Sequence, residues 1–84
     1  MIAVIHLFAG ARELVGMASV TIAVRDGATV ADLRRALMQQ HPDLTPLLDR
    51  SRIAVDQEFA ADTAVVPDGA EIALIPPVSG GLIP

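Results

Sequence analysis

Residues 71–81 read EIALIPPVSGG, so that a short apolar strand runs directly into a proline pair and a glycine pair. Pro76 and Pro77 end the strand and favour an extended backbone, because proline lacks an N–H group and has a fixed φ. Gly80 and Gly81 carry no side chain and therefore fit narrow channels. We expect a folded domain over residues 1–76 and an extended, flexible, uncharged C-terminal tail over residues 77–84.

The partner of this last strand is expected at the start of the chain. Ile2–Phe8 is a nearly unbroken apolar run with His6 as its polar member, which is typical of a central strand covered on both faces. The pattern breaks over Ala9–Gly16, which contains two glycines, and resumes in the β-branched run Val20–Val24. We expect a hairpin-like pair here, with the first and last strands of the chain at the centre of the sheet.

One main helix is expected in the middle of the chain. Thr29 is followed three residues later by Asp32, which resembles a capping box and predicts a helix from Val30. Pro42 disfavours helical geometry at the preceding residue, so the helix should end near Gln40. Apolar residues at helical spacing form one stripe that should pack on the sheet: Val30, Leu33, Ala36 and Leu37.

Shorter elements are expected in the second half of the chain. The leucines around Pro46 predict a short helical turn that closes one end of the core. Arg52–Val55 predicts a strand, with Asp56-Gln57 as a tight connection to Glu58-Phe59, and Pro67-Asp68-Gly69 is a turn signal. This order predicts an α+β domain in which one main helix crosses one face of a mixed sheet of four to five strands.

The composition argues against several kinds of site. The 84 residues suffice for one domain, and the absence of cysteine excludes disulfides, thiolate nucleophiles and cysteine-based metal sites. A net charge of −4 and an aromatic inventory of two phenylalanines argue against nucleic acid as a partner. No segment is as long and apolar as a membrane span, and no signal peptide is recognisable, so we expect a cytoplasmic protein without membrane association.

Residues with catalytic potential are scattered along the sequence. His6 and His41 do not have the spacing of a metal site, and the serines have no plausible histidine and acid relay. The glycines do not form a phosphate-binding loop. A structural role for His6 is favoured over a role as ligand or base by about ten to one. We therefore expect no metal site, no bound cofactor and no catalytic apparatus within the chain itself.

An apolar surface is expected on the sheet face away from the main helix. Alternation in the last strand sends Ala73 and Ile75 outward, near Val4 and Phe8. One helix cannot cover both faces, and an exposed aliphatic patch on so small a protein marks a docking surface. Partial cover by neighbouring loops is the alternative. Docking is favoured by roughly two to one because the same strand delivers the uncharged tail.

Three motifs together resemble one protein family. FAGARELVG over residues 8–16, TVADL over residues 29–33, and DGAEI over residues 68–72 before PPVSGG resemble the small subunit of molybdopterin synthase. The resemblance spans residues 1–81, and its most specific motif is the PPVSGG ending. It implies the ubiquitin-like β-grasp fold, which agrees with the element order above.

The resemblance implies a sulfur carrier in molybdenum cofactor biosynthesis. An ATP-dependent adenylyltransferase, similar to ubiquitin-activating enzymes, would join the Gly81 carboxylate to AMP, and sulfur would then replace AMP to give a thiocarboxylate. The large subunit of the synthase would receive this group beside cyclic pyranopterin monophosphate, so that the chain acts as the small subunit of a sulfurtransferase. The implied partner-binding residues are Phe8, Ile75, Pro76, Pro77, Val78, Ser79, Gly80 and Gly81.

The sequence departs from this family after the glycine pair, where Leu82-Ile83-Pro84 follow Gly81. Our leading hypothesis is a precursor that a peptidase cuts after Gly81. A second possibility is that these three residues were added by design or by the assignment of the gene end. A third is that the chain has lost carrier activity and only binds partners. Two other functions stay open: a carrier for thiamine biosynthesis, against which Pro76-Pro77 argues, and a non-carrier β-grasp interaction module with a blocked tail.

Overall fold

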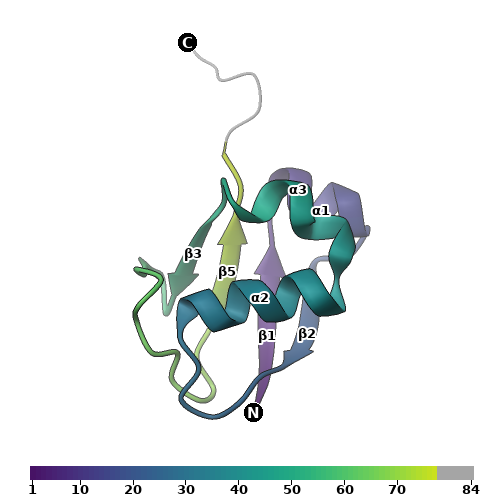
Figure 1. Ribbon diagram of the computed structural model, residues 1–84. Coiled ribbons are helices and arrows are strands. Elements are labelled where there is room, and N and C mark those ends of the chain that lie inside the picture. Colours follow the sequence, from purple (N-terminus) through teal and green to yellow (C-terminus); the bar gives the residue numbers. More distant parts are fainter. Residues whose placement is uncertain (78–84) are drawn as a thin grey trace.

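A computed structural model, shown in Figure 1, describes residues 1–77 of the chain. A five-stranded mixed sheet has the strand order β2-β1-β5-β3-β4. β1 and β5 are neighbours and run parallel, whereas the other adjacent strands are antiparallel. The elements in chain order are β1 (Ile2–Leu7), α1 (Ala9–Val15), β2 (Ser19–Ala23), α2 (Val30–Gln40), the 3₁₀ helix η1 (Pro42–Leu44), α3 (Thr45–Leu48), β3 (Arg52–Val55), β4 (Glu58–Phe59) and β5 (Ile72–Ile75).

This arrangement confirms the predicted α+β architecture and its ubiquitin-like β-grasp topology. The first and last strands lie side by side inside the sheet, and α2 crosses one face of it (Figure 1). Within residues 1–77, none of the helices has the length and apolar character that a membrane span requires.

Helix α2 begins and ends where the sequence predicts. The Thr29 hydroxyl accepts a hydrogen bond from the Asp32 backbone N–H at 3.3 Å, and the Asp32 carboxylate accepts one from the Thr29 N–H at 2.9 Å. This capping box satisfies N–H groups that the helix start would otherwise leave without partners. The predicted stripe is the buried face of the helix: Val30, Leu33, Ala36 and Leu37.

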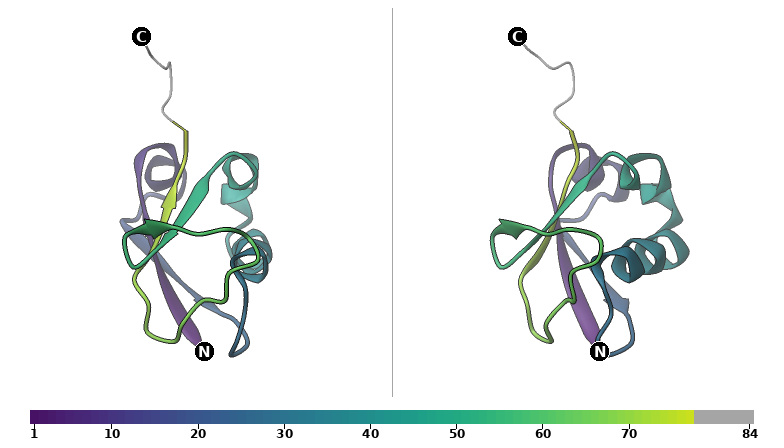
Figure 2. Two further views of the ribbon diagram at one scale, coloured as in Figure 1. Left: turned by 90° about the vertical axis from the view of Figure 1, so that its left-hand side faces the viewer. Right: turned by 60° about the vertical axis from the view of Figure 1, so that its left-hand side comes forward.

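The hydrophobic core lies between α2 and one face of the sheet. Strand β1 buries its odd-numbered residues there, including Ile5 and Leu7, and β5 contributes Ile72 and Leu74. The predicted helical turn around Pro46 is present as η1 and α3, which close the end of the core with two buried leucines, Leu44 and Leu48. Figure 2 shows α2 and α3 on the same side of the sheet, so the opposite face is left without a helical cover.

Two expectations from the sequence are wrong. The segment Ala9–Gly16 breaks the strand pattern as predicted, but it was expected to be a loop and it forms helix α1 over Ala9–Val15. Gly16 ends this helix with φ 76°, a left-handed conformation that glycine adopts at low cost, so it is a cap rather than a general helix breaker. Ile2–Phe8 was expected to be covered on both faces, but its even-numbered residues are exposed because all the helical cover lies on the other side.

The short connections agree with the sequence. Asp56 and Gln57 join β3 to β4 with φ values of 51° and 72°, as a two-residue turn with positive φ at both positions requires. The turn forms without glycine. Residues 67–70 also form the predicted turn, in which the Ala70 N–H donates to the Pro67 carbonyl at 3.2 Å.

Candidate functional site

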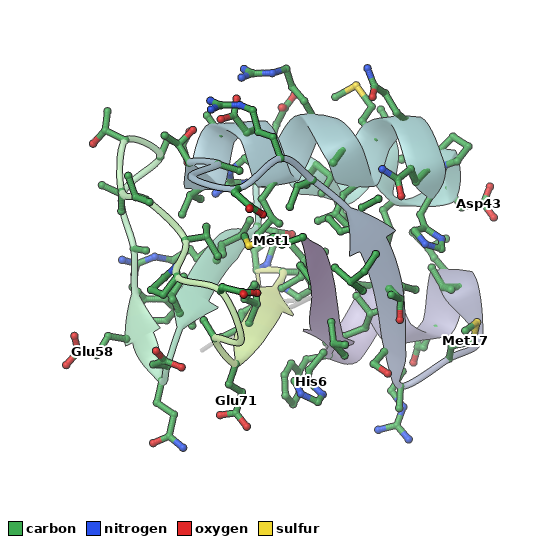
Figure 3. All side chains as sticks on the ribbon, turned by 90° about the horizontal axis from the view of Figure 1, so that it is seen from below. Met1, His6, Met17, Asp43, Glu58 and Glu71 are labelled. Carbon is green, nitrogen blue, oxygen red and sulfur yellow. The ribbon has the colours of Figure 1, made fainter. Side chains whose placement is uncertain are left out.

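An open groove of about 380 Å³ lies on the sheet face away from α2. The strand registers place four residues in one row across β1, β5, β3 and β4, namely His6, Ala73, Ala54 and Phe59. The two alanines therefore form a low floor between larger side chains. The lining residues are His6, Phe8, Ala54, Gln57, Phe59, Glu71, Ala73 and Ile75. Figure 3 shows that His6 and Glu71 lie on the side of the sheet opposite α2.

One end of the groove lies at the root of the tail. Ile75 is the last residue of β5, is half-buried, and lines the groove together with Phe8. Phe8 directly precedes α1 in extended backbone geometry, and 49% of its surface is exposed. Pro76 is buried and Pro77 is exposed, so the chain leaves the folded body between these two prolines. Any segment that follows Pro77 therefore starts next to the groove.

The positively charged side chain of Arg52 lies beside Phe59, which forms the wall of the groove on the β4 side. The guanidinium carbon of Arg52 is 3.8 Å from the centroid of the Phe59 ring, which is within the range of a cation–π contact. In the sheet, Arg52 is paired with Ile75 of the neighbouring strand. The sheet face thus presents an aliphatic side chain, an aromatic ring and a positive charge close together.

The end of the groove away from the tail is held by hydrogen bonds between Asp56 and Glu71. The Asp56 N–H donates to the Glu71 carbonyl at 2.7 Å, and the Asp56 carboxylate accepts from the Glu71 N–H at 2.9 Å. These bonds fasten the β3–β4 hairpin to the start of β5. Because the hairpin carries Phe59, they also fix that wall of the groove.

Asp32 has a strongly shifted pKa but lies on α2, outside the groove. The pKa of Asp32 is lowered to about 2, chiefly by the hydrogen bond from the Thr29 backbone and against the opposing effect of burial. The Thr29 hydroxyl, the charge of Arg25 and the hydrogen bond from Arg35 contribute to the same lowering. The carboxylate therefore stabilises the start of α2 and has no contact with the proposed docking face.

The described part of the chain shows no assembled metal site. Within residues 1–77, no three histidine or acidic side chains are grouped so that they could hold a metal ion. His6 is exposed on the outer face of β1, whereas His41 follows the last residue of α2 on the other side of the sheet. The structure therefore does not bring the two imidazoles together.

The sequence identified one part of this surface and missed the other. Phe8 and Ile75 were predicted, and they line the groove together. The predicted residues Val78, Ser79, Gly80 and Gly81 lie outside the described residues. Val4 is exposed on the same face but does not line the groove. The residues that sequence reasoning did not assign to the site are His6, Arg52, Ala54, Gln57, Phe59 and Glu71.

The missed residues required knowledge of strand pairing. Alternation alone places Arg52 and Ala54 on one side of β3, but it does not say which strand lies next to β3. Once β3 is known to pair with β5, Ala54 falls beside Ala73 and Arg52 beside Ile75. The available signal was a short strand that ends in an aromatic residue, Phe59, in a chain with very few aromatic residues.

The chain is similar to known proteins over almost its whole length. The model of the ThiS family matches residues 5–81. A molybdopterin synthase sulfur carrier subunit from Arabidopsis thaliana is 36% identical over 75 residues, which cover 89% of this chain and 78% of that protein. Another from Chlamydomonas reinhardtii is 37% identical over 76 residues, covering 88% of this chain and 92% of that protein.

A solved structure supports the same relationship. The crystal structure of small archaeal modifier protein 1 from Haloferax volcanii superposes with a TM-score of 0.84 at 34% identity, and the match covers 96% of this chain and all of that one. The fold is therefore shared along with the sequence. The ThiS family model covers more than nine-tenths of the residues of this chain. The chain therefore belongs to the ThiS family and is a relative of the molybdopterin synthase sulfur carrier subunits.

Proposed function

We propose that this chain is a sulfur carrier of molybdopterin synthase and that Gly81 is the group that carries sulfur. The observation that supports this most strongly is the extent of the family match, which includes Gly80 and Gly81 and stops at residue 81. The names of the similar proteins from Arabidopsis and Chlamydomonas give the same function. Because Leu82-Ile83-Pro84 follow Gly81, the carrier becomes competent after a peptidase removes these three residues.

The chemistry requires two activation steps. A carboxylate is a poor electrophile, so an oxygen of the Gly81 carboxylate attacks the α-phosphorus of ATP, pyrophosphate leaves, and an acyl adenylate forms. A sulfur nucleophile then attacks the acyl carbon, and AMP leaves with the electrons of the broken C–O bond. With sulfide as the nucleophile the product is a thiocarboxylate, whose ionised sulfur attacks cyclic pyranopterin monophosphate and forms a thioester. Water then cleaves the bond between this sulfur and the Gly81 acyl carbon, which leaves the sulfur on the pterin and regenerates the Gly81 carboxylate. ATP and the catalytic groups come from a partner adenylyltransferase and from the large synthase subunit.

The groove on the outer sheet face is proposed as the docking surface for the large subunit. Apolar contact surface and aromatic or arginine anchors are typical of the centre of protein interfaces. Phe8, Ile75 and Phe59 supply the apolar surface, and Arg52 supplies a charge that suits an acidic residue of the partner. Docking here would bring the root of the tail against the partner, so that residues 78–81 extend into its active site.

A second candidate function is attachment to other proteins. It is favoured by the high structural similarity to a protein whose name describes it as a modifier. A modifier would use the same adenylated Gly81, but an amine of the target protein would attack it in place of sulfur. This protein has no lysine, so a second copy could not be attached to a lysine side chain of the first to form a polymer.

Reconstitution separates these functions. A variant that ends at Gly81 is incubated with a cognate adenylyltransferase, ATP and sulfide, and its intact mass is measured. The sulfur carrier proposal predicts a mass increase equal to the exchange of one oxygen for one sulfur, and the full chain of residues 1–84 should not react. Reaction with a protein amine but not with sulfide would favour the modifier function, and no adduct of either kind would argue against both.

A further inference from the structure

The turn between β3 and β4 carries a glutamine at a position that favours glycine. Gln57 has φ 72° and Asp56 has φ 51°, so both central residues of the turn have positive φ. Such turns favour Asp-Gly or Asn-Gly, because a Cβ atom makes positive φ unfavourable and glycine has none. Asp56 is a residue type that tolerates this conformation, and it is held by two hydrogen bonds to Glu71. Gln57 has neither advantage, so the fold alone would favour glycine there.

The side chain of Gln57 lines the groove on the outer sheet face. It lies at the end away from the tail, because the turn follows Val55, which is paired with Ile72 at the start of β5. Gln57 is exposed, and none of the side-chain hydrogen bonds among residues 1–77 involves its amide. An unfavourable backbone conformation indicates a function when the side chain that it carries lines a binding surface. The groove therefore gives a reason for glutamine at this position that the turn does not.

Another glutamine of the same chain shows what such an amide can bind. The Gln40 Nε2 donates to the Ala23 carbonyl at 2.9 Å, and the Gln40 Oε1 accepts from the Ala23 N–H at 3.1 Å. Ala23 is the last residue of β2, which is an edge strand of the sheet. One amide thus satisfies both backbone groups of a residue in an extended strand. The Gln57 amide offers the same donor and acceptor to a segment that lies in the groove.

We propose that Gln57 is a specificity-determining residue of the docking groove, whose amide binds the N–H and carbonyl of one residue in an extended segment of the large subunit. Ala54 and Ala73 form the low floor of the groove, which leaves room for a backbone to approach the sheet. Glu71 lines the same end of the groove, so glutamine supplies hydrogen bonds there without adding a second negative charge. This inference rests on the proposed function in taking the groove as the docking surface for the large subunit.

Two substitutions separate the amide from the backbone conformation, in the chain that ends at Gly81. Gln57→Gly removes both the amide and the unfavourable Cβ, so the unfolding temperature should rise by about 4 °C while the affinity for the large subunit falls about tenfold. Gln57→Met keeps the length of the side chain and the Cβ, so it should lose the same affinity without a rise in unfolding temperature. Gln39→Met, at an exposed position of α2 outside the groove, is the matched control and should leave the affinity unchanged. Isothermal titration calorimetry and circular dichroism measure the two quantities.

Unchanged affinity in Gln57→Met would overturn the inference. Tighter binding of Gln57→Glu would also overturn it, because the partner would then present a cation to this position in place of a peptide group. A Gln57→Gly variant less stable than its parent would show that the glutamine serves the turn. Ile75→Asp separates this inference from the proposed docking surface: if it weakens binding and Gln57→Met does not, the groove stands and only the role of Gln57 fails, whereas if neither weakens binding, both fail. Sulfur exchange at Gly81 is measured without the large subunit and is independent of either result.

Discussion

The guanidinium carbon of Arg52 lies 3.8 Å from the centroid of the Phe59 ring, across the hairpin formed by β3 and β4. Arg52 lies beside the point where β5 delivers the tail, because it is paired with Ile75, whereas Phe59 lies on β4 in the row of Ala54 and Ala73. The contact therefore orients the aromatic wall of the groove and places a positive charge on the same surface. This arrangement connects a local side-chain contact with the docking function proposed for the face.

A double-mutant cycle should detect the interaction between Arg52 and Phe59. Arg52→Met keeps a long apolar side chain without charge, and Phe59→Leu keeps an apolar side chain without the ring. We expect a coupling energy of about 0.5–1 kcal/mol, as is typical of an exposed cation–π pair. Urea unfolding of the four proteins measures it, and fully additive effects on the free energy of unfolding would contradict a direct contact.

Ile75→Asp should weaken binding to the large synthase subunit by about tenfold or more, because it places a charge in an apolar interface. Isothermal titration calorimetry with the variant that ends at Gly81 measures the affinity. Val4→Asp is the matched control, since Val4 is exposed on the same sheet face but does not line the groove. Equal loss of affinity in the two variants would show that the groove is not the docking surface.

Asp32→Asn should lower the stability of the protein in a pH-dependent way. The pKa of Asp32 is lowered in the folded protein from its ordinary 3.8 to about 2, so the folded state binds this proton more weakly than the unfolded state. The stabilisation is therefore fully present above pH 3.8 and is lost as the pH falls through about 2. Urea unfolding from neutral to acidic pH should show the two proteins converging, and a constant difference would argue against this role.

Gly16→Ala and Gly10→Ala should change stability in opposite directions. Gly16 caps α1 with φ 76°, so an alanine there is strained even though no atom lies within 4 Å of the added Cβ, and we expect a loss of about 1 kcal/mol. Gly10 lies inside the same helix, and a Cβ there would meet Leu47 at an ordinary 3.6 Å. Alanine at this position should raise the free energy of unfolding by about 0.5–1 kcal/mol. Thermal unfolding followed by circular dichroism ranks the two variants, and a stabilising Gly16→Ala would contradict the assigned cap.

Gly81→Ala should impair sulfur transfer without changing the stability of the domain. The added methyl group displaces the reacting carbon in the partner's active site, and small misplacements can cost about 10²-fold in rate. We expect at least about a tenfold loss in a single-turnover assay with the large subunit. The unfolding temperature should equal that of the parent chain ending at Gly81. Unchanged turnover would mean that Gly81 does not enter a restricted site.

The sequence was sufficient to predict those helices and strands whose boundaries depend on residues close together in the chain. The boundaries of α2 follow from Thr29, Asp32 and Pro42, because capping and proline sterics act within a few residues. The alternation of β5 also identified Ala73 and Ile75 as the outward-facing residues, whereas the apolar run of β1 led to the wrong expectation of cover on both faces. Helix α1 was missed because its cap, Gly16, was taken as a general interruption, although glycine after the last helical residue ends many helices.

The groove was only half predictable because it depends on contacts between distant segments. Phe8 and Ile75 were found from alternation and from their position next to the tail. Phe59 and Ala54 join them only because β3 pairs with β5, which neither strand encodes on its own. Short strands have too little pattern to specify their neighbours, so the cation–π contact of Arg52 could not be expected from the sequence either.

Intact-mass measurement of the protein purified from its native host tests the central claim most directly. The account predicts a chain that ends at Gly81, of which a fraction carries a single exchange of oxygen for sulfur, with fragmentation locating the sulfur on the Gly81 carboxyl group. Protein that is active in sulfur transfer and still contains Leu82-Ile83-Pro84, or sulfur located anywhere else in the chain, would contradict it.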